Sequence, residues 1–462
     1  MQLINAGALA QNVTATFTLP VGGRFTSATV QENAGTCEVS ADRVVCNVPR
    51  VEYFKRIIFD LSYVAAERLD GADMVLRAST GEDNTADFSF WLTAHFPVMT
   101  TADEGPDSLR QALLEAREHC ADRPCAIDFL VSGTIAPVSP LPEVWGRVKI
   151  DGGGEIEIDG SALPEGSDGL VLRTGCDNSV SNLTIKNVPR HAIEVHATEP
   201  ATPCLLGFYY PIIAGNRLTG NERGVVQSAG SWIQIRDNVI RGNRRAGIFL
   251  GTGFYASITH NTIVENGASG IFLNLGDSSR STVAGADVEG NVIANNGEWG
   301  LCRTPNGEVS LTDNSIYGNV SAGIDIGLDN ETPNRENDGN GTPNKPELFS
   351  ATYDAAAGTT TIRGHIQSRP IVGGGLRIDV YASSSLSLWG YAQGEEKVGV
   401  KFLLPGSADF EVIVPRDLRG KFITATNTRS HNVGWAQPPQ EQSHTNSAPG
   451  DTSEFSNAIQ VQ

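Results

Sequence analysis

One phrase recurs through the middle of the sequence and restricts the possible folds more than any other feature. Each copy has an asparagine, an aliphatic residue two positions later, a second asparagine, and a small residue before another aliphatic one. The leading asparagines are Asn216, Asn238, Asn261, Asn291 and Asn314. Their steps of 22, 23, 30 and 23 residues are typical of a solenoid, in which each repeat forms one coil stacked on the next.

The repeat also predicts how each coil is built. It has room for about three strands of a few residues and lacks the leucine ladder of horseshoe-shaped solenoids. We expect the aliphatic residues to point inward and to stack on those of neighbouring coils. We expect the paired asparagines in turns, in the left-handed conformation that asparagine accepts, with amides bonded along the axis. The glycine before the next aliphatic is expected to permit a sharp turn.

These features resemble the right-handed parallel β-helix superfamily, which includes pectate lyases, other carbohydrate-active proteins and many bacterial surface proteins. The segment TTADEGPDSLRQALLEA, with the later VKIDGGGEIEIDGSAL, resembles the N-terminal segment of secreted β-helix proteins named for a Cys-Ser-Leu-Arg-Glu-Ala motif. The matching residues are Ser108, Leu109, Arg110 and Ala112, and the replaced ones are Asp107 and Gln111. The resemblance covers about 100–462 and implies an architecture rather than an activity.

An amphipathic helix is predicted over about 106–118, before the repeats. Acidic residues and Pro106 lie at its start, which favours helix initiation. Its apolar face comprises Leu109, Ala112, Leu113 and Ala116. Because the open end of a β-helix exposes its core and its strand edges, we expect this helix to cap it.

The flanking regions indicate two β-sandwich domains. Residues 1–95 contain alternating strands such as NVTATFTLP, a hairpin with a cysteine on each arm, and GEDNTADFSF; they resemble the immunoglobulin-like repeat domain of bacterial surface proteins. That family usually has an additional leading strand, so we expect truncation here or a strand from a neighbouring chain. Residues 346–462 alternate again. The predicted fold is therefore all-β: a right-handed parallel β-helix over 96–345 with an N-terminal capping helix, flanked by two sandwiches.

Cysteine spacing and charge bear on location and partners. The three close pairs are Cys37–Cys46, Cys120–Cys125 and Cys176–Cys204, with Cys302 left over. Disulfides at these pairs would need an oxidising compartment, whereas the alternative is seven reduced, buried thiols. A net charge of -19 argues against nucleic acid and anionic membranes as partners, and no apolar run is long enough to span a bilayer. We expect a secreted or cell-surface protein.

Candidate chemistry lies on the outer face of the coils. If the aliphatics face inward, the residue after each one faces outward. The resulting column is Glu194, Val226, Phe249, Phe272, Cys302 and Asp325. Glu194 with His196 is the candidate acid–base pair, against the alternative of a solvated surface. Phe249 and Phe272 are candidates for stacking on a sugar ring, or for packing under a loop.

Further candidates lie in a basic patch and in an insertion. Arg236 and Arg241 could hold a carboxylated glycan, or be neutralised by nearby acids. Tyr209 and Tyr210 belong to a long insertion between coils and are candidates for covering a ligand.

The polar loop 331–345 imitates the start of a calcium loop. The position that closes an EF-hand with an acid is Lys345, so the spacing does not fit that motif. With Asp325, Asp329 and Asp338 the region could still hold Ca²⁺, and no other cofactor is expected.

Three functions are consistent with these features. The preferred one is a non-catalytic adhesion, glycan-contact or structural role, because the outward column is not rich in carboxylates. The alternatives are a polysaccharide lyase, hydrolase or epimerase acting in a groove on the β-helix, and a subunit of an extracellular filament. The enzyme interpretation requires Glu194, His196 and the arginines to converge beneath the 200–212 loop.

Overall fold

The computed structural model describes residues 2–462 except 5–9, 20–23, 32–34, 52–55, 65–72, 81–84, 92, 121–123, 174–177, 197–210, 230–231, 253–254, 277–284, 306, 337, 339–341, 369–374, 404–408 and 430–449. The chain forms two compact units. One comprises 1–97, 115–128 and 146–149, and the other comprises 98–114, 129–145 and 150–462. The predicted domain boundaries at 95 and 345 remain predictions.

The first unit contains the N-terminal β-sandwich. One antiparallel sheet has the order β1-β6-β3 and the other β4-β5-β2-β7-β8. The strands are β1 (Gln2–Ile4), β2 (Ala10–Thr18), β3 (Arg24–Gln31), β4 (Thr36–Val39), β5 (Arg43–Val51), β6 (Arg56–Val64), β7 (Asp73–Thr80) and β8 (Thr85–Trp91). Phe17 and Phe59 meet edge to face at 5.1 Å in the core. The predicted Cys37–Cys46 disulfide joins β4 to β5.

The predicted helix is present as α1 (Leu109–His119) and begins later than expected. Asp107 has a φ of 60°, which a helix cannot contain, and the Ser108 hydroxyl accepts a hydrogen bond from the Gln111 amide as an N-cap. The predicted apolar face is buried. A second predicted disulfide, Cys120–Cys125, closes the loop before β10 (Pro124–Phe129). The role of helix α1 as a cap of the β-helix remains a prediction. The third predicted disulfide, Cys176–Cys204, lies outside the described residues.

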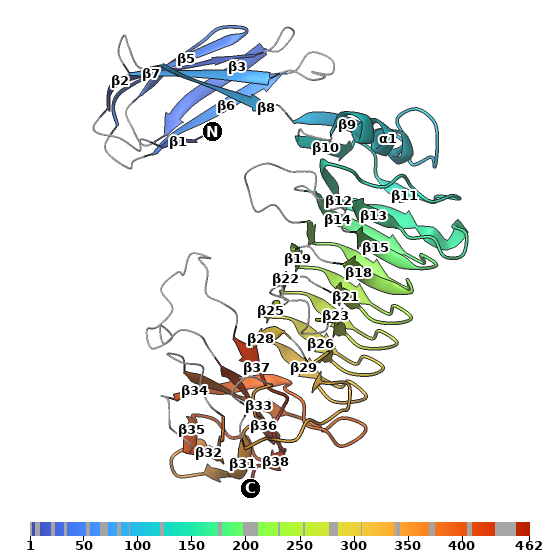
Figure 1. Ribbon diagram of the computed structural model, residues 1–462, viewed down its shortest axis with the longest axis vertical. Coiled ribbons are helices and arrows are strands. Elements are labelled where there is room, and N and C mark those ends of the chain that lie inside the picture. Colours follow the sequence, from blue (N-terminus) through green and yellow to red (C-terminus); the bar gives the residue numbers. More distant parts are fainter. Residues whose placement is uncertain are drawn as a thin grey trace. The chain divides into compact units, whose positions relative to one another are not determined.

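The repeats form the predicted parallel β-helix (Figure 1). One parallel sheet has the order β13-β15-β18-β21-β24-β27-β30, and a second includes β14, β16–β17, β19–β20, β22–β23, β25–β26 and β28–β29. Each full coil therefore contributes three short strands. The strands are β11 (Gly133–Ile135), β12 (Arg147–Asp159), β13 (Leu170–Arg173), β14 (Ser179–Lys186), β15 (His191–His196), β16 (Ile212–Ala214), β17 (Arg217–Thr219), β18 (Arg223–Ala229), β19 (Trp232–Arg236), β20 (Val239–Arg241), β21 (Ile248–Thr252), β22 (Tyr255–Thr259), β23 (Thr262–Val264), β24 (Ile271–Leu273), β25 (Gly285–Glu289), β26 (Val292–Ala294), β27 (Leu301–Arg303), β28 (Glu308–Thr312), β29 (Ser315–Tyr317) and β30 (Ile324–Ile326).

Inward aliphatic residues stack in register from coil to coil. Ile193 pairs with Val225, which pairs with Ile248, and Ile248 pairs with Ile271. All four side chains are buried, and burying each one stabilises the fold by about 1.5–3 kcal/mol. The solenoid thus has one continuous core along its axis.

Two buried ladders of asparagine amides run along this axis. In one, Asn216 Nδ2 donates to Asn238 Oδ1, and the pattern continues to Asn314; in the other it runs from Asn221 to Asn319. The expected left-handed conformation at these asparagines was wrong, because the positive φ belongs to the preceding residue, for example Asp237 or His260. The ladder asparagine is thereby free to aim its amide at the next coil.

The repeated glycines have a different role from the one expected. Gly247 has no positive φ, so it does not supply an unusual turn. A Cβ at this position would lie 2.7 Å from Ile263 Cγ2 and 2.8 Å from the Gly270 carbonyl oxygen. Glycine is therefore required because successive coils approach closely here.

The second unit also contains the predicted C-terminal sandwich. Its sheets have the orders β31-β32-β35 and β34-β33-β36-β37, with β38 on β36. The strands are β31 (Glu347–Asp354), β32 (Thr359–His365), β33 (Leu376–Ser383), β34 (Glu396–Leu403), β35 (Asp409–Val414), β36 (Phe422–Arg429), β37 (Asp451–Thr452) and β38 (Ile459–Gln460). It covers the last coil, where Gln393 Oε1 accepts from Asn319 Nδ2 and ends one asparagine ladder. Along the described part of the chain, no helix has the length and apolar character needed to cross a membrane.

Candidate functional site

Strand β15 brings the predicted acid–base pair together. Glu194 and His196 are two residues apart, so the strand pleat places them on the same side. Glu194 Oε1 lies 2.7 Å from His196 Nε2. Glu194 is aligned with Val171 in the preceding coil and Val226 in the following one, as the outward column predicted. The position is nonetheless covered, because Glu194 is only 1% exposed.

His196 is held on both of its ring nitrogens. Arg173 Nη1 lies 3.3 Å from His196 Nδ1. Since arginine only donates, Nδ1 is the acceptor whenever the ring is neutral, and Nε2–H donates to Glu194. Arg173 in turn pairs with Glu143 at 2.6 Å. Its hydrogen bonds and charge lower the pKa of Glu143, against the effect of burial.

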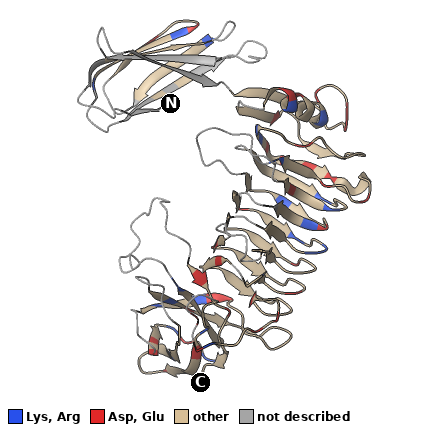
Figure 2. Ribbon diagram, viewed as in Figure 1, with Lys and Arg blue, Asp and Glu red and all other residues tan. Residues whose placement is uncertain are grey.

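Further charged groups surround Glu194 on its other side. Arg190 Nη1 donates to Asp168 Oδ2 at 2.9 Å and to Glu194 Oε2 at 3.1 Å. The Ser228 hydroxyl donates to Glu194 Oε1 at 3.0 Å. The backbone N–H of His191 donates to Asp168 Oδ1 at 3.1 Å. Figure 2 shows basic and acidic residues along these coils, around β15 and β18.

Burial separates the protonation behaviour of these groups. It raises the pKa of Asp168 to about 7, and a hydrogen bond with Glu194 adds to that effect. Burial also acts to raise the pKa of Glu194, but the Asp168 hydrogen bond and the charges of His196 and Arg190 outweigh it and lower that pKa. Burial lowers the pKa of His191 to about 4. His191 is therefore neutral at pH 7.

Two groups of side chains among the described residues have ligand atoms close enough to surround one cation. They are Asp168 with His191 and Glu194, and Asp325 with Asp329 and Glu454; within each group the ligand atoms lie within 4.8 Å of one another. Only the first group includes an imidazole, and His191 Nδ1 is buried with no hydrogen-bond partner.

The predicted calcium residues are only partly brought together. Asp325 and Asp329 lie close, but Asp338 is buried elsewhere, where it accepts from the Asn344 amide and the Ser368 hydroxyl. The Asp325 carboxylate accepts hydrogen bonds from the backbone N–H groups of residues 328, 329 and 330. These bonds give the carboxylate a role in closing a turn.

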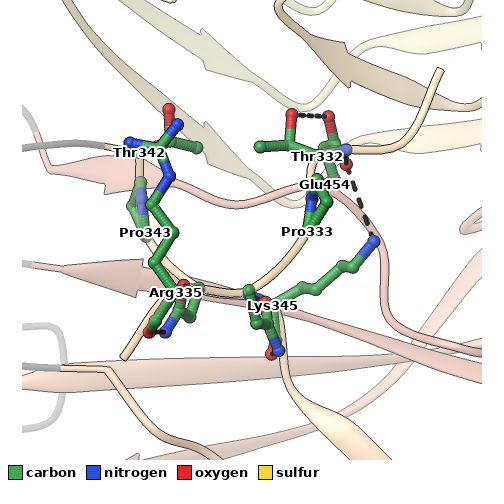
Figure 3. A pocket seen from close by; sticks show the side chains of 9 residues that line it. Thr332, Pro333, Arg335, Thr342, Pro343, Lys345 and Glu454 are labelled. Atoms are coloured by element: carbon green, nitrogen blue, oxygen red, sulfur yellow. Dashed lines mark hydrogen bonds and ion pairs between the residues drawn. The ribbon is translucent and has the colours of Figure 1, made fainter. Parts of the chain in front are cut away.

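A small pocket lies in the loop 331–345 next to Glu454 (Figure 3). Lys345 Nζ lies 2.7 Å from Glu331 Oε1 and 3.8 Å from Glu454 Oε2. Thr332 donates to Glu454 through both its backbone N–H and its hydroxyl. Lys345 thus supplies the positive charge where the calcium-loop pattern has its closing acid.

Phe249 and Phe272 stack on each other in adjacent coils. Their ring centroids are 5.1 Å apart and their planes differ by 11°. The Arg223 guanidinium lies 5.3 Å from the Phe249 centroid. The ring of Phe249 therefore has an arginine and a phenylalanine as neighbours, whereas Phe272 has a phenylalanine on one side.

The predicted basic residues do not converge on Glu194. Arg236 pairs with Asp237 at 2.9 Å, and Arg241 pairs with Glu265 at 2.7 Å. Both pairs are about half exposed and start from strands of the other sheet, β19 and β20. Tyr209 and Tyr210 lie outside the described residues.

An aromatic pair on that second sheet was not predicted from the sequence. Trp232 in β19 and Tyr255 in β22 occupy equivalent positions of adjacent coils, with centroids 4.5 Å apart. Trp232 is 46% exposed, and the Tyr255 hydroxyl donates to Asp287 at 2.6 Å. Their separation of 23 residues equals that of Asn238 and Asn261, which is the signal that could have revealed them. Asp168, Arg173 and Arg190 lie outside the repeated phrase and carried no such signal.

Comparisons with known proteins agree with the coil architecture. Residues 144–337 match the family model described as NosD, periplasmic copper-binding protein. No curated protein matches the sequence.

Three solved structures are similar at low identity. The A-module of Azotobacter vinelandii mannuronan C-5 epimerase AlgE4 is 15% identical, with a TM-score of 0.28 over 49% of this chain and 79% of that one. A mutant of the periplasmic alginate epimerase AlgG is 12% identical, with a TM-score of 0.23 over 44% of this chain and 69% of that one. The catalytic domain of a GH87 alpha-1,3-glucanase is 11% identical, with a TM-score of 0.17 over 70% of this chain and 82% of that one. Over its coils, this chain is a β-helix protein similar to the periplasmic NosD family.

Proposed function

We propose that this chain is an exported β-helix protein that binds a polysaccharide along its coils without transforming it. The Trp232–Tyr255 pair is the observation that carries the proposal. Adjacent coils lie about 4.8 Å apart, so two aromatic residues at equivalent positions offer a continuous apolar surface of the size of a sugar ring. Aromatic rings bind the apolar faces of sugars, while nearby polar groups bind the hydroxyls.

The surroundings of this pair suit such a ligand. In the coil after Tyr255 the equivalent residue is Gly285, which has no side chain to cover the tyrosine ring. Asp287 lies next to the pair and accepts from the tyrosine hydroxyl, so its carboxylate offers further acceptor capacity to a sugar hydroxyl. The stacked Phe249 and Phe272 form a second candidate contact on the other sheet.

The geometry around Glu194 favours binding over catalysis. A general base needs a free lone pair within reach of its substrate. His196 Nδ1 already faces Arg173, and Nε2 faces Glu194. Glu194 itself is almost fully buried. The carboxylate–imidazole pair therefore serves as an internal network in this arrangement.

Affinity electrophoresis against a panel of neutral and acidic polysaccharides tests the proposal. We expect retardation by at least one polysaccharide and at least tenfold weaker binding in Trp232→Ala. Trp389→Ala is the matched control, since Trp389 is 70% exposed in the C-terminal sandwich, and it should bind as the wild type does. Equal loss in both variants, or no binding to any polymer, would overturn the proposal.

The same panel decides about catalysis. Product release, measured as new reducing ends, unsaturated products or epimerised residues, is expected to be absent. Release that is lost in Glu194→Gln, with the thermal midpoint unchanged, would replace the proposal by the enzyme alternative.

A further inference from the structure

We propose that Asp168, His191 and Glu194 form a binding site for one divalent transition-metal ion. This inference goes beyond the proposed polysaccharide binding and does not depend on it. It rests on an unpartnered nitrogen, on two carboxylate oxygens that already hold a cationic group, and on side chains that orient the ligands.

His191 supplies the first observation. It begins β15 and is 3% exposed, and among the described residues its Nδ1 has no hydrogen-bond partner. A buried polar atom without a hydrogen-bond partner destabilises the folded chain. Its imidazole has a nitrogen within 4.8 Å of a carboxylate oxygen of Asp168 and of Glu194. A metal ion in this cluster would coordinate the imidazole nitrogen that lies within reach of both carboxylates.

In each of the two carboxylates, one oxygen is held by hydrogen bonds from neighbouring groups, and the second oxygen faces the cationic group. Asp168 Oδ1 accepts from the His191 backbone N–H. Glu194 Oε1 faces the His196 ring and the Ser228 hydroxyl. These contacts fix the orientation of the ligands, as outer-shell hydrogen bonds do in metal sites. The oxygens Oδ2 and Oε2 remain to face a cation.

Arg190 occupies the position of that cation. Its Nη1 lies 2.9 Å from Asp168 Oδ2 and 3.1 Å from Glu194 Oε2, so one positive group bridges the same two oxygens. The Arg190 side chain is 42% exposed, and it has room to turn into solvent. Metal ion and guanidinium would therefore compete for one place.

The donor set indicates the class of metal. One imidazole nitrogen with two carboxylate oxygens suits Zn²⁺ or Cu²⁺, whereas Ca²⁺ takes six to eight oxygen ligands. Three protein ligands leave a coordination position for water. The second cluster, at Asp325, has only carboxylates, and backbone N–H groups engage Asp325 and Glu454.

Calorimetric titration of the chelator-treated full chain tests the inference. We expect one Cu²⁺ or Zn²⁺ per chain and at least tenfold weaker binding in Asp168→Asn. Arg190→Gln should bind at least tenfold more tightly, because the competing guanidinium is gone. Arg236→Gln removes an exposed arginine of another ion pair and should leave the affinity unchanged. Ca²⁺ should bind at least a hundredfold more weakly.

Electron paramagnetic resonance of the Cu²⁺ complex gives a readout independent of affinity. It should show nitrogen coupling from one imidazole, and His191→Gln should abolish it. If that variant does not fold, the opposite responses of Asp168→Asn and Arg190→Gln decide alone. Absence of a stoichiometric site, equal affinity in both variants, or loss of binding in Asp329→Asn would overturn the inference. Trp232→Ala should leave the affinity for the metal ion unchanged. The metal site and the polysaccharide surface can therefore fail or succeed independently of each other.

Discussion

The asparagine ladder can be tested by removing one central amide, with Asn266→Ala. Asn266 is buried, and its Oδ1 accepts from Asn243 twice, from Nδ2 at 2.9 Å and from the backbone N–H at 3.1 Å. Its Nδ2 donates to Asn296 Oδ1 at 3.0 Å and to the Ile240 carbonyl at 3.2 Å. One substitution therefore breaks four hydrogen bonds across three coils.

The expected cost follows from the groups left without a partner. The backbone N–H of Asn243 and one of its Nδ2 hydrogens lose their acceptor inside the core. Each such donor costs about 1–3 kcal/mol, so we expect the free energy of unfolding to fall by about 2–6 kcal/mol. The control is Asn274→Ala, because Asn274 is partly exposed and, among the described residues, its Oδ1 accepts one weak bond, from Gly276 at 3.3 Å. It should cost less than about 1 kcal/mol.

Urea unfolding followed by far-UV circular dichroism measures both variants. The midpoint should fall clearly in Asn266→Ala with an unchanged slope. Hydrogen exchange should show faster exchange at the amides of β20 and β23, because coils next to the gap open more easily. Equal midpoints for the two variants would refute the reasoning, since the amides would then contribute no more than a surface contact.

Three further predictions concern the coils and their C-terminal cover. Gly247→Ala should lower the free energy of unfolding by about 1–3 kcal/mol, because its Cβ would lie 2.7 Å from Ile263 Cγ2. Gly242→Ala, which is strained by a φ of 62°, should lower it by about 1–2 kcal/mol. Urea unfolding measures both variants. Asp451→Asn removes the charge 2.8 Å from the buried Arg303 guanidinium and should cost about 3–5 kcal/mol by thermal unfolding, whereas replacing both residues by apolar ones should restore most of it. Gln393→Ala should expose the end of one ladder and speed amide exchange in the last coil; unchanged exchange would contradict its role as a terminal cap.

Several features of the fold were predictable because they are local and repeated. The period of about 22 residues, the inward aliphatics and the two asparagines per coil recur with little error, so they predict a stacked β-helix without any knowledge of long-range contacts. The helix near 106–118 and two of the disulfides were also predictable, because helix capping and the closure of a short loop depend on residues that are neighbours in the sequence.

Other features depended on how one coil covers another. The tolerance of asparagine for the left-handed conformation predicts left-handed turns at the ladder asparagines, but the positive φ belongs to the residue before each of them. Likewise Glu194, Cys302 and Asp325 do follow inward aliphatics in register, yet all three are buried. An alternating pattern predicts which side a residue faces, but not what covers that side.

The sequence by itself determined the repeating unit, because burial of aliphatic side chains and pairing of backbone amides act within each coil and between its direct neighbours. Only the tertiary structure decided which non-repeated residues meet. Asp168 approaches Glu194 from the preceding coil, and Arg190 bridges the two carboxylates. Such contacts depend on the register between coils and on the length of each connecting turn, and neither is encoded at any single position.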